Sequence, residues 1–418
     1  MQKIIIKNFG PITNAEIDIK NFLVLIGDNA IGKSTVIKLI STFLWMEKAL
    51  VRGDYTVEYF TKNNRFRNEI CKYYKIENYF VPHNLLQAGT EIIFKGTMFC
   101  FKYNCGLLLD DDKLLIKKID KTVSYRLPQI TYIPAERNLV EIVKNPKTLK
   151  LISNFLIDFI SEYDKAKNEL KGYLQIPIGD DISIRYQREN DTVYIKGSNY
   201  EIPLNEAASG IQSNVPLYLV TWYLSKSVIE QSKISQNMSI DEIDRFKKGV
   251  EDILANENFT EEQRRAALSV LSLQFKKTAF INIIEEPEQN LFPVSQMQML
   301  KSLISICNKN EDNKLILSTH SPYILTILNN SLFAQRVIDK SNNAEEEVSK
   351  IIDKESRMKS DDFSAYVLTN DNGNVSSKSI IDEATGMIGQ NYLDIVSEML
   401  GYEFNALYKI HAKTFQRQ

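Results

Sequence analysis

The feature that most constrains the fold of this chain is a short loop between an apolar strand and a helix. Residues 27–34 read Gly-Asp-Asn-Ala-Ile-Gly-Lys-Ser and match the pattern G-x4-G-K-[ST]. Residues 22–26 before the loop are all apolar, which is typical of a strand covered on both faces, and residues 34–49 after it have a helical pattern. In such a unit the backbone N–H groups of the loop can surround phosphate groups. The sequence therefore predicts an α/β fold that binds a nucleotide through its phosphates.

Two side chains at the end of this loop carry most of the expected chemistry. Lys33 can reach the β- and γ-phosphates, and Ser34 can ligate Mg²⁺. The expected cofactors are therefore ATP and Mg²⁺. The loop residues predicted to contact the nucleotide are Gly27, Asn29, Ala30, Ile31, Gly32, Lys33, Ser34 and Thr35.

Composition narrows the class of protein further. The net charge of −2 over 418 residues means that nucleic acid could bind only through a local patch. The four cysteines form no C-x2-C pair, and with three histidines a zinc site is not expected. No apolar run approaches the roughly 18 residues of a transmembrane helix, and no signal-peptide pattern is present. We expect a cytoplasmic protein with reduced thiols and no membrane contact.

A second apolar strand, residues 279–286, ends in two adjacent carboxylates. Side chains at neighbouring strand positions point in opposite directions, so Glu285 and Glu286 are expected to have different roles. One can bind Mg²⁺, and the other can orient and deprotonate an attacking water molecule. The alternative is an ordinary solvated strand end, which two carboxylates by themselves do not exclude.

Two further segments fit phosphate chemistry in combination with the first two. Ser209 and Gly210 precede a helix whose N-terminus would present free N–H groups, although an ordinary cap with glycine in the turn has the same pattern. His320 follows an apolar strand and could hydrogen-bond a γ-phosphate. A structural histidine is the simpler interpretation of that residue alone.

These four elements, in this order, resemble the ABC-type ATPase head of the SMC, RecF and OLD-like group. The resemblance extends to the small bacterial AAA-family defence and repair ATPases, with the Septu type as the closest analogy. In the terms of that group, residues 27–34 are the Walker A loop, 208–212 the signature, 280–286 the Walker B strand and 318–322 the H-loop. Residues 286–293, Glu-Pro-Glu-Gln-Asn-Leu-Phe-Pro, are similar to its D-loop.

The resemblance implies an ATPase that dimerises head to tail around two ATP molecules. Glu286 would then be the catalytic base, His320 would contact the γ-phosphate, and Glu285 with Ser34 would hold Mg²⁺. The signature would contact the nucleotide that is bound to the partner subunit.

The sequence departs from the pattern of that group at several positions. Glu285 stands where the Walker B aspartate usually is, and Ile211 replaces the second glycine of the signature. Gln289 and Phe292 occupy D-loop positions where the small defence ATPases often carry histidine. Any role of those two side chains is therefore open.

One more segment, residues 132–138, resembles these small ATPases. Within it, Arg137 could take part in phosphate chemistry or form a salt bridge, and the salt bridge is the more common use of such an arginine. The Q-loop of the group has two candidates, Gln87 and Gln129, and is left unassigned.

The whole chain, residues 1–418, is predicted to be a single ATPase head with an added subdomain. Residues 55–127 are predicted to hold an antiparallel β-rich subdomain, because residues 90–133 are rich in β-forming residues. The signature and the Walker B strand are much farther apart than in transporter nucleotide-binding subunits, which argues against a transporter head.

The segment that separates those two motifs, residues 231–277, predicts a charged helical insertion. Within it Thr260 and Gln263 predict a capping box at a helix start. Residues 340–418 predict a C-terminal extension, and its last part, residues 391–407, has the spacing of an amphipathic helix.

The sequence contains the parts for ATP chemistry and no second catalytic constellation. Histidines are too few for an HNH nuclease, and too few residues follow His320 for a Toprim domain. We expect a dimer, or a multiple of dimers, that regulates a separately encoded effector such as a nuclease in bacterial antiphage defence. Two alternatives stay open: a non-hydrolysing ATP-gated scaffold, and a DNA-repair-type clamp that touches DNA or RNA. The basic pairs that could serve such a clamp are Lys117-Lys118, Arg264-Arg265 and Lys276-Lys277.

Overall fold

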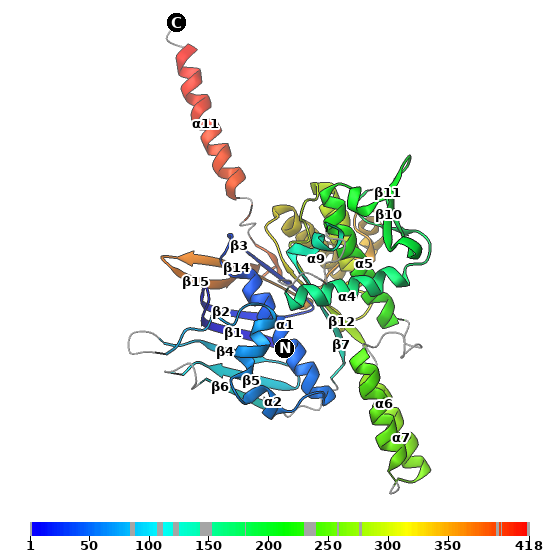
Figure 1. The fold of residues 1–418 in the computed structure, drawn as a ribbon. Coiled ribbons are helices and arrows are strands. Elements are labelled where there is room, and N and C mark those ends of the chain that lie inside the picture. The colour runs from blue at the N-terminus through cyan, green and yellow to red at the C-terminus, as the bar shows by residue number, and fades with distance from the viewer. Residues whose placement is uncertain are drawn as a thin grey trace.

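The computed structural model has one large mixed sheet with helices packed against it, a small second sheet, and two helical segments that project from the body (Figure 1). The residues that the structure describes are 2–83, 88–106, 112–119, 125–142, 153–179, 181–229, 240–256, 259–275, 278–389, 393 and 395–415.

Among the described residues the large sheet has eleven strands, in the order β6-β5-β4-β1-β2-β15-β14-β3-β13-β12-β7. Strands β14, β3, β13, β12 and β7 are parallel to one another, while β2, β1, β4, β5 and β6 form an antiparallel part. The bounds of the strands are β1 Gln2–Phe9, β2 Ile12–Ile19, β3 Phe22–Gly27, β4 Glu91–Lys95, β5 Phe99–Asn104, β6 Lys113–Lys118, β7 Pro128–Ile133, β12 Ala279–Glu285, β13 Lys314–Ser318, β14 Phe363–Asp371 and β15 Asn374–Ser379.

The parallel part of the sheet is buried on both faces. Every residue of β3 and β12 is buried, as expected for strands that helices cover on both sides. Helix α1 (Lys33–Arg52) packs on β3, β13, β12 and β7, helix α5 (Ser209–Ile229) on β12, and helix α8 (Pro293–Cys307) on β13. Helix α4 (Asn154–Glu169) packs on α5 and on β7, and helix α9 (Pro322–Lys340) packs on α8. This packing fixes the carboxyl ends of the parallel strands in a rigid frame.

The remaining described elements are short. The small sheet has the order β11-β10-β9-β8, and β16 pairs with β17. The bounds are α2 Val57–Thr61, α3 Leu139–Ile142, β8 Leu174–Gln175, β9 Ser183–Gln187, β10 Thr192–Lys196, β11 Glu201–Pro203, α10 Glu345–Ser349, β16 Ile381–Asp382 and β17 Met387–Ile388.

The β-rich region is arranged differently from the sequence expectation in two respects. Strands β4, β5 and β6 are antiparallel as predicted, but they extend the large sheet from β1 instead of forming a separate one. Strand β7, which the sequence placed at the end of the same antiparallel stretch, pairs in parallel with β12. It therefore belongs to the part of the sheet that carries the candidate site.

Two strands near the C-terminus lie in the middle of the sheet, and the sequence predicted no strand there. Strand β14 pairs in parallel with β3, and Leu368 lies opposite Gly27 in the register. A Cβ on Gly27 would lie 2.6 Å from the carbonyl oxygen of Leu368, and the φ of Gly27 is +145°. Only glycine fits this position. Part of residues 340–418 therefore shapes the start of the Walker A loop.

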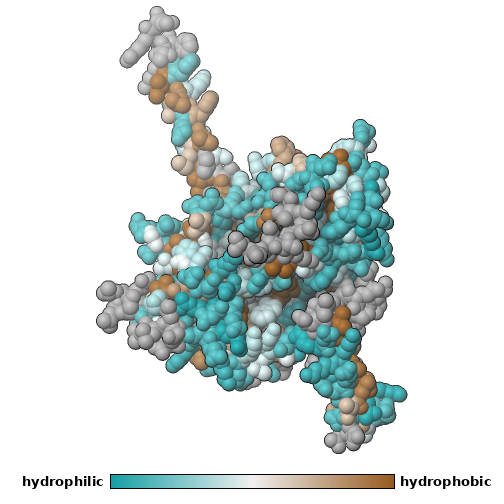
Figure 2. All heavy atoms as spheres, viewed as in Figure 1, coloured by the Kyte–Doolittle hydropathy of each residue, from teal (hydrophilic) through white to brown (hydrophobic). Residues whose placement is uncertain are grey.

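The two projecting segments are helical (Figure 1). Helices α6 (Ile240–Ala255) and α7 (Glu261–Phe275) pack on each other within the insertion, and Nη1 of Arg245 lies 2.8 Å from Oδ1 of Asp54, just after the end of α1. Helix α11 (Ile395–Phe415) projects elsewhere, and Figure 2 shows apolar side chains along it. Its large exposed apolar side chains are Met399, Leu400, Tyr402, Phe404, Leu407, Tyr408 and Ile410.

Candidate nucleotide-binding site

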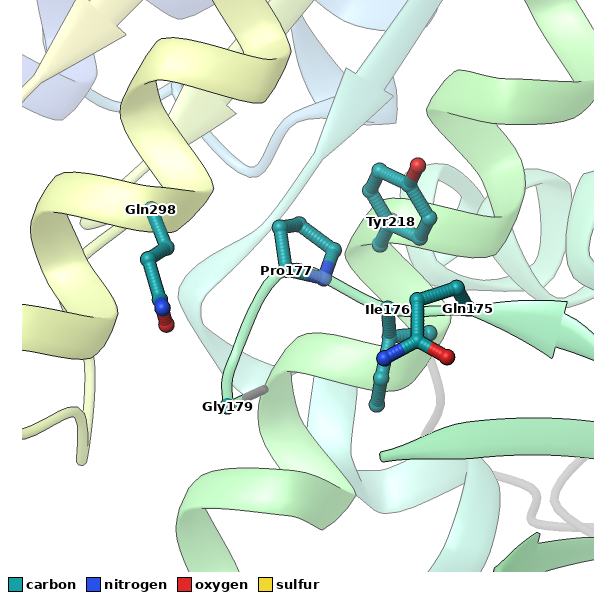
Figure 3. A pocket seen from close by; sticks show the side chains of 6 residues that line it. All are labelled: Gln175, Ile176, Pro177, Gly179, Tyr218 and Gln298. Carbon is teal, nitrogen blue, oxygen red and sulfur yellow. The ribbon is translucent and has the colours of Figure 1, made fainter. Parts of the chain in front are cut away.

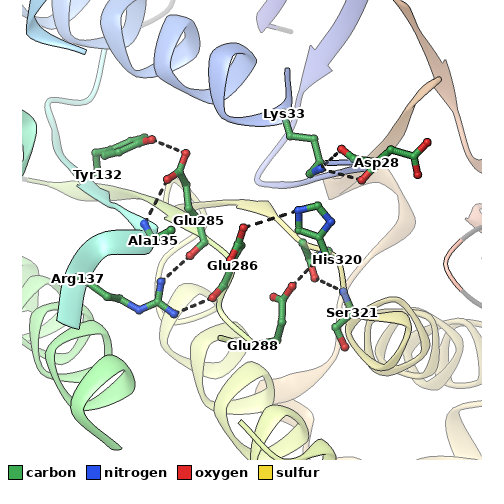
Figure 4. Close-up of polar contacts among 12 residues, drawn as sticks. Asp28, Lys33, Tyr132, Ala135, Arg137, Glu285, Glu286, Glu288, His320 and Ser321 are labelled. Atoms are coloured by element: carbon green, nitrogen blue, oxygen red, sulfur yellow. Dashed lines mark hydrogen bonds and ion pairs between the residues drawn. The ribbon is translucent and has the colours of Figure 1, made fainter. Parts of the chain in front are cut away.

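Three of the four sequence motifs meet at one edge of the sheet, at the carboxyl ends of adjacent parallel strands. Strands β3, β13 and β12 are neighbours, and the register places Leu25, Ser318 and Glu285 in one row. The Walker A loop, the H-loop and the D-loop follow directly after this row, and Figure 4 shows their side chains converging. Ligands of open α/β sheets bind outside the carboxyl ends of the strands. The topology therefore brings the predicted residues together at the expected edge.

The Walker A loop presents the start of helix α1 to this space. In the described structure no side chain caps the first turn of α1, and no residue of that turn is acidic. The main chain has positive φ angles of 62° at Ala30 and 109° at Gly32, and the side chain of Ser34 is exposed. An uncapped helix start with a free hydroxyl group fits phosphate oxygens, and it fits Mg²⁺ through that hydroxyl.

Lys33 is the buried cation of the site. Its Nζ donates two hydrogen bonds of 2.7 Å, to the carbonyl oxygens of Gly27 and Asp28. Burial lowers the pKa of Lys33 to about 8, against the opposing effect of the carboxylates of Glu286 and Asp28. A bound polyphosphate would favour the charged ammonium group and raise that pKa. Lys33 is thus placed to neutralise phosphate charge.

Glu285 is buried at the end of β12, and both of its carboxylate oxygens are held. Oε1 accepts a hydrogen bond of 2.7 Å from the hydroxyl of Tyr132, and Oε2 accepts one of 3.2 Å from the backbone N–H of Ala135. Each oxygen keeps a further lone pair that can bind a cation directly or through water. A carboxylate with a fixed orientation suits a metal ligand better than a group that must take up a proton.

Glu286 and His320 face each other across the site (Figure 4). Oε1 of Glu286 lies 3.7 Å from Nε2 of His320, and the two side chains are 38% and 33% exposed. Burial, and then the positive charge of Lys33, lower the pKa of His320, so the imidazole is neutral at neutral pH. A partly exposed carboxylate beside a neutral imidazole can take a proton from water, which fits Glu286 as a base.

Glu288 belongs to the same constellation, although the sequence analysis gave it no role. Its Oε1 accepts a hydrogen bond of 2.7 Å from the backbone N–H of His320 and so joins the D-loop to the H-loop. Burial raises its pKa, and its Oε2 is buried with no hydrogen-bond partner among the described residues. The one available signal in the sequence was its position two residues after Glu286.

The signature lies against the D-loop. Ser209 is exposed at the start of α5, and a Cβ on Gly210 would lie 2.4 Å from the carbonyl oxygen of Asn290. The side chain of Asn214 donates a hydrogen bond of 2.8 Å to the carbonyl of Gln289. The close contact with Asn290 therefore accounts for a glycine at position 210 without any phosphate. No hydrogen bond between described residues joins this turn to the Walker A loop.

Two residues considered from sequence have structural partners instead. Arg137 is fully buried and donates to backbone carbonyls, and among the described residues it does not form the salt bridge that was the more common expectation. The amide of Gln129 bonds Glu162 and Ser227, each at 3.1 Å, at the amino end of β7 and away from the carboxyl edge. The other Q-loop candidate, Gln87, lies outside the described residues.

A cavity of about 410 Å³ lies elsewhere, between α5, α8 and the segment that follows β8 (Figure 3). The residues that line it are Gln175, Ile176, Pro177, Gly179, Tyr218 and Gln298. None of these side chains is charged, so the cavity lacks the cation that a polyphosphate needs.

The basic pairs suggested for a nucleic-acid clamp are only partly described. Lys117-Lys118 lies on β6 and Arg264-Arg265 on α7, whereas Lys276-Lys277 lies outside the described residues. Nη1 of Arg264 is 3.0 Å from a carboxylate oxygen of Glu261, which offsets its charge.

A comparison with protein-family models decides the family. The model described as AAA ATPase domain matches residues 1–171 and 224–325, which is well over half of the chain. The chain belongs to this AAA ATPase domain family. The match includes the Walker A loop, Walker B, the D-loop and the H-loop, and it leaves out the segment with the signature and everything after residue 325.

Solved structures similar to this AAA ATPase domain include SMC heads. The SMC head domain from Thermotoga maritima is 10% identical with a TM-score of 0.34, over 90% of this chain and 98% of that one. An SMC head bound to the C-winged helix domain of ScpA is 10% identical with a TM-score of 0.38, over 90% and 97%. A head with an extended coiled coil, bound to the C-terminal domain of ScpA derived from Pyrococcus furiosus, is 9% identical with a TM-score of 0.38, over 96% and 100%. No curated protein matches the chain.

The predicted α/β fold of a P-loop NTPase is confirmed by the match to the AAA ATPase domain model and by the mixed sheet with its parallel part. Within the part of the chain that the structure describes, no helix is both long enough and apolar enough to cross a bilayer.

Proposed function

We propose that this AAA ATPase domain binds ATP with Mg²⁺ and hydrolyses it to ADP and phosphate. The observation that carries the proposal is the convergence of Lys33, Glu285, Glu286 and His320 at the carboxyl ends of three adjacent parallel strands. A cation for the phosphates, a carboxylate that can hold Mg²⁺ and a second carboxylate that can orient water are recurring parts of sites for phosphoryl transfer.

Each side chain has one task in this mechanism. Lys33 and the start of α1 neutralise charge that develops on the phosphates. Ser34 and Glu285 would hold Mg²⁺, which when bound supplies further charge neutralisation on the phosphate oxygens. Glu286 takes a proton from the attacking water, and His320, neutral because of its lowered pKa, donates a hydrogen bond towards the γ-phosphate.

We place the complete site in a head-to-tail dimer, in which the signature of one subunit contacts the nucleotide of the other. Two features of this chain support that arrangement. Ser209 is exposed and has no hydrogen bond to the Walker A loop of its own chain among the described residues. Phe292 and Val294, on the D-loop and the start of α8 beside it, are 74% and 53% exposed. Large exposed apolar side chains next to a motif are typical of a protein–protein contact.

The α6–α7 pair is the proposed contact for a separate effector, such as a nuclease, in cytoplasmic antiphage defence. It is inserted between α5, which begins with the signature, and β12, which ends in the Walker B carboxylates. The ion pair between Arg245 and Asp54 also connects it to the end of α1. A conformational change at the bound nucleotide could thus be transmitted to the α6–α7 pair through α5, β12 and α1.

Phosphate release is the direct test of the enzymatic proposal. Purified protein with ATP and Mg²⁺ should release phosphate at a rate that EDTA abolishes. ATP binding and ATP-dependent dimerisation without any release would instead support the non-hydrolysing scaffold. The same preparation incubated with DNA or RNA tests the clamp alternative.

The effector proposal needs a separate experiment. The product of a neighbouring gene should co-purify with the full chain and be lost after deletion of residues 235–272. ATPase activity should survive this deletion, which distinguishes a lost contact from a damaged head. A complex that persists unchanged would refute the α6–α7 pair as the contact.

A further inference from the structure

Arg137 is the largest fully buried side chain of the described residues, with 0% exposure. Among those residues no ion pair joins it to a carboxylate, and all four of its hydrogen bonds go to backbone carbonyls. Burying a guanidinium group destabilises the fold unless its N–H donors are hydrogen-bonded. The four bonds to backbone carbonyls therefore offset the free-energy cost of burying Arg137.

The four carbonyls come from three elements of the site. Nη1 and Nη2 donate hydrogen bonds of 2.7 Å to the carbonyls of Glu285 and Glu286. Nη1 also donates to the carbonyl of Pro134, at 3.2 Å, just after β7, and Nε donates to the carbonyl of Ser213, at 2.9 Å, in the first turns of α5. One planar group therefore joins the end of Walker B, the end of β7 and the signature helix. Figure 4 shows its two bonds to Glu285 and Glu286.

The backbone of Glu286 needs such support. Its φ is +46°, in the left-handed region that side chains other than glycine seldom adopt and that persists only when the surroundings hold it. Its N–H donates to the carbonyl of Ser318, and its carbonyl accepts from Arg137. Hydrogen bonds at both the N–H and the carbonyl group of Glu286 thus hold the proposed catalytic base in this strained conformation.

Further bonds tie the same segment to the signature helix. The side chain of Asn214 donates to the carbonyl of Gln289, and Nδ2 of Asn290 donates to Oγ of Ser213. The first turns of α5 and the segment that carries Glu286 therefore share these two hydrogen bonds in addition to the close contact between Gly210 and Asn290. Because these contacts are closely packed, a displacement of the first turns of α5 should also displace the segment that carries Glu286.

The guanidinium group of Arg137 stays charged while it makes these four hydrogen bonds to backbone carbonyls. Burial lowers the pKa of Arg137 to about 10, and the carboxylates of Glu288, Glu286 and Glu285 oppose that effect. Four of the five N–H donors of an arginine side chain point at carbonyls and none of the group is exposed. Arg137 could reach a phosphate only by giving up these bonds.

We propose that Arg137 is a positioning residue that holds Glu286 in its catalytic place and couples it to the signature helix. The proposal rests on the proposed function. It adds that contact of Ser209 with a partner's nucleotide is transmitted to the subunit's own base through Ser213 and Arg137.

The test compares Arg137→Lys with the wild type, alone and combined with Glu286→Gln. Lysine keeps the charge but loses the planar fork that reaches two carbonyls at once. We expect kcat to fall about 10- to 100-fold, as for a misplaced catalytic group, while the ATP affinity stays within about threefold. In the Glu286→Gln background, Arg137→Lys should lower kcat almost no further, because the carboxylate that Arg137 positions is already absent.

Arg357→Lys is the matched control. Arg357 is 4% exposed and bonds the carbonyl of Ile352 and the carboxylate of Glu345, far along the chain from the motifs. Its replacement should lower stability without changing kcat. If Arg137→Lys does not fold, Arg137→Ala with added guanidinium ion supplies the same comparison, and turnover should be restored by the ion.

Two outcomes would overturn the proposal. One is an unchanged kcat in Arg137→Lys, and the other is a full multiplicative loss in the Glu286→Gln background. Amide hydrogen exchange gives an answer that needs no turnover: residues 286–290 and 209–214 should lose protection together in Arg137→Lys. Loss in one segment alone would refute the coupling. If the wild type releases no phosphate, the proposed function is refuted. The hydrogen-exchange result would still show whether residues 209–214 and 286–290 are coupled through Arg137.

Discussion

The hydroxyl group of Tyr132 donates a hydrogen bond of 2.7 Å to Oε1 of Glu285. The ring of Tyr132 packs edge-on against Tyr74 and Phe155, with ring centroids 5.1 Å and 5.6 Å apart, and it is buried. The hydroxyl of Tyr74 in turn lies 2.6 Å from that of Ser41 on α1. A strand next to Walker B thus fixes the orientation of the proposed Mg²⁺ ligand.

Tyr132→Phe should therefore raise the Mg²⁺ concentration needed for half-maximal turnover, by about 10-fold for a lost support of a metal ligand. The phenyl ring still fills the space, so ATP affinity without Mg²⁺ should not change. The measurement is phosphate release against Mg²⁺ concentration.

Tyr74→Phe is the control for this prediction. It removes a buried hydroxyl from the same cluster but leaves the bond to Glu285 intact. An equal shift of the Mg²⁺ requirement in both variants would show that loosened packing, and not the orientation of Glu285, is responsible.

ATP binding should weaken as the pH rises above about 8. In the nucleotide-free chain the pKa of Lys33 is lowered to about 8, and its charged form is the one that phosphate oxygens favour. Below this pH the ammonium group is already present, so affinity is flat. Above it, binding must be accompanied by proton uptake, and the affinity falls towards a limit of about tenfold per pH unit.

Titrations with ATP between pH 6.5 and pH 9.5 check this prediction. The variant Lys33→Met should bind weakly at every pH and lack the fall. An affinity that is constant up to pH 9.5 in the wild type would contradict the role of Lys33.

How much of this could be predicted from the sequence depends on how local each feature is. The Walker A loop is local, because strand, turn and helix follow one another, and the predicted helix start and strand were confirmed in β3 and α1. The capping box at Thr260 and Gln263 is local too, and both of its hydrogen bonds are present.

The features that the sequence did not predict depend on partners far away in the chain. Strand β14 has a place in the sheet only because β3 lies beside it, and no spacing rule links the two. The reason for Gly210 is the carbonyl of Asn290, and the partners of Arg137 come from three separate elements. A salt bridge is the more common use of an arginine side chain, but the sequence alone cannot show which backbone carbonyls point into the interior.

Gly210→Ala should destabilise the chain even without nucleotide. The added methyl carbon would lie 2.4 Å from the carbonyl oxygen of Asn290, which cannot move without the D-loop. We expect a loss of about 1–3 kcal/mol, as for overpacking of a tight contact. Thermal denaturation of the nucleotide-free protein measures it.

Gly401→Ala provides the comparison, because nothing lies within 4 Å of a Cβ at this exposed helical position. Alanine there should leave the melting temperature unchanged or slightly higher. Equal behaviour of the two variants would refute the D-loop explanation for Gly210.

Ser209→Arg should block ATP-dependent dimerisation and leave ATP binding by the monomer intact. The long charged side chain would stand where the signature meets the nucleotide of the partner, while the Walker A loop of the same chain is untouched. Light scattering with and without ATP gives the result, and Ser341→Arg, an exposed site after α9, is the control. Undiminished dimerisation of the Ser209 variant would argue against a composite site.

Glu286 is the proposed base for ATP hydrolysis in a site formed by the carboxyl ends of β3, β13 and β12. The most direct test of this role is phosphate release and ATP binding measured side by side for wild type, Glu286→Gln and Glu285→Gln. Glu286→Gln should bind ATP as tightly as the wild type, turn over about 10²- to 10⁴-fold more slowly, and accumulate as a closed dimer. Phosphate release by Glu285→Gln should instead need a higher Mg²⁺ concentration than that by the wild type. Undiminished turnover in Glu286→Gln would contradict the account.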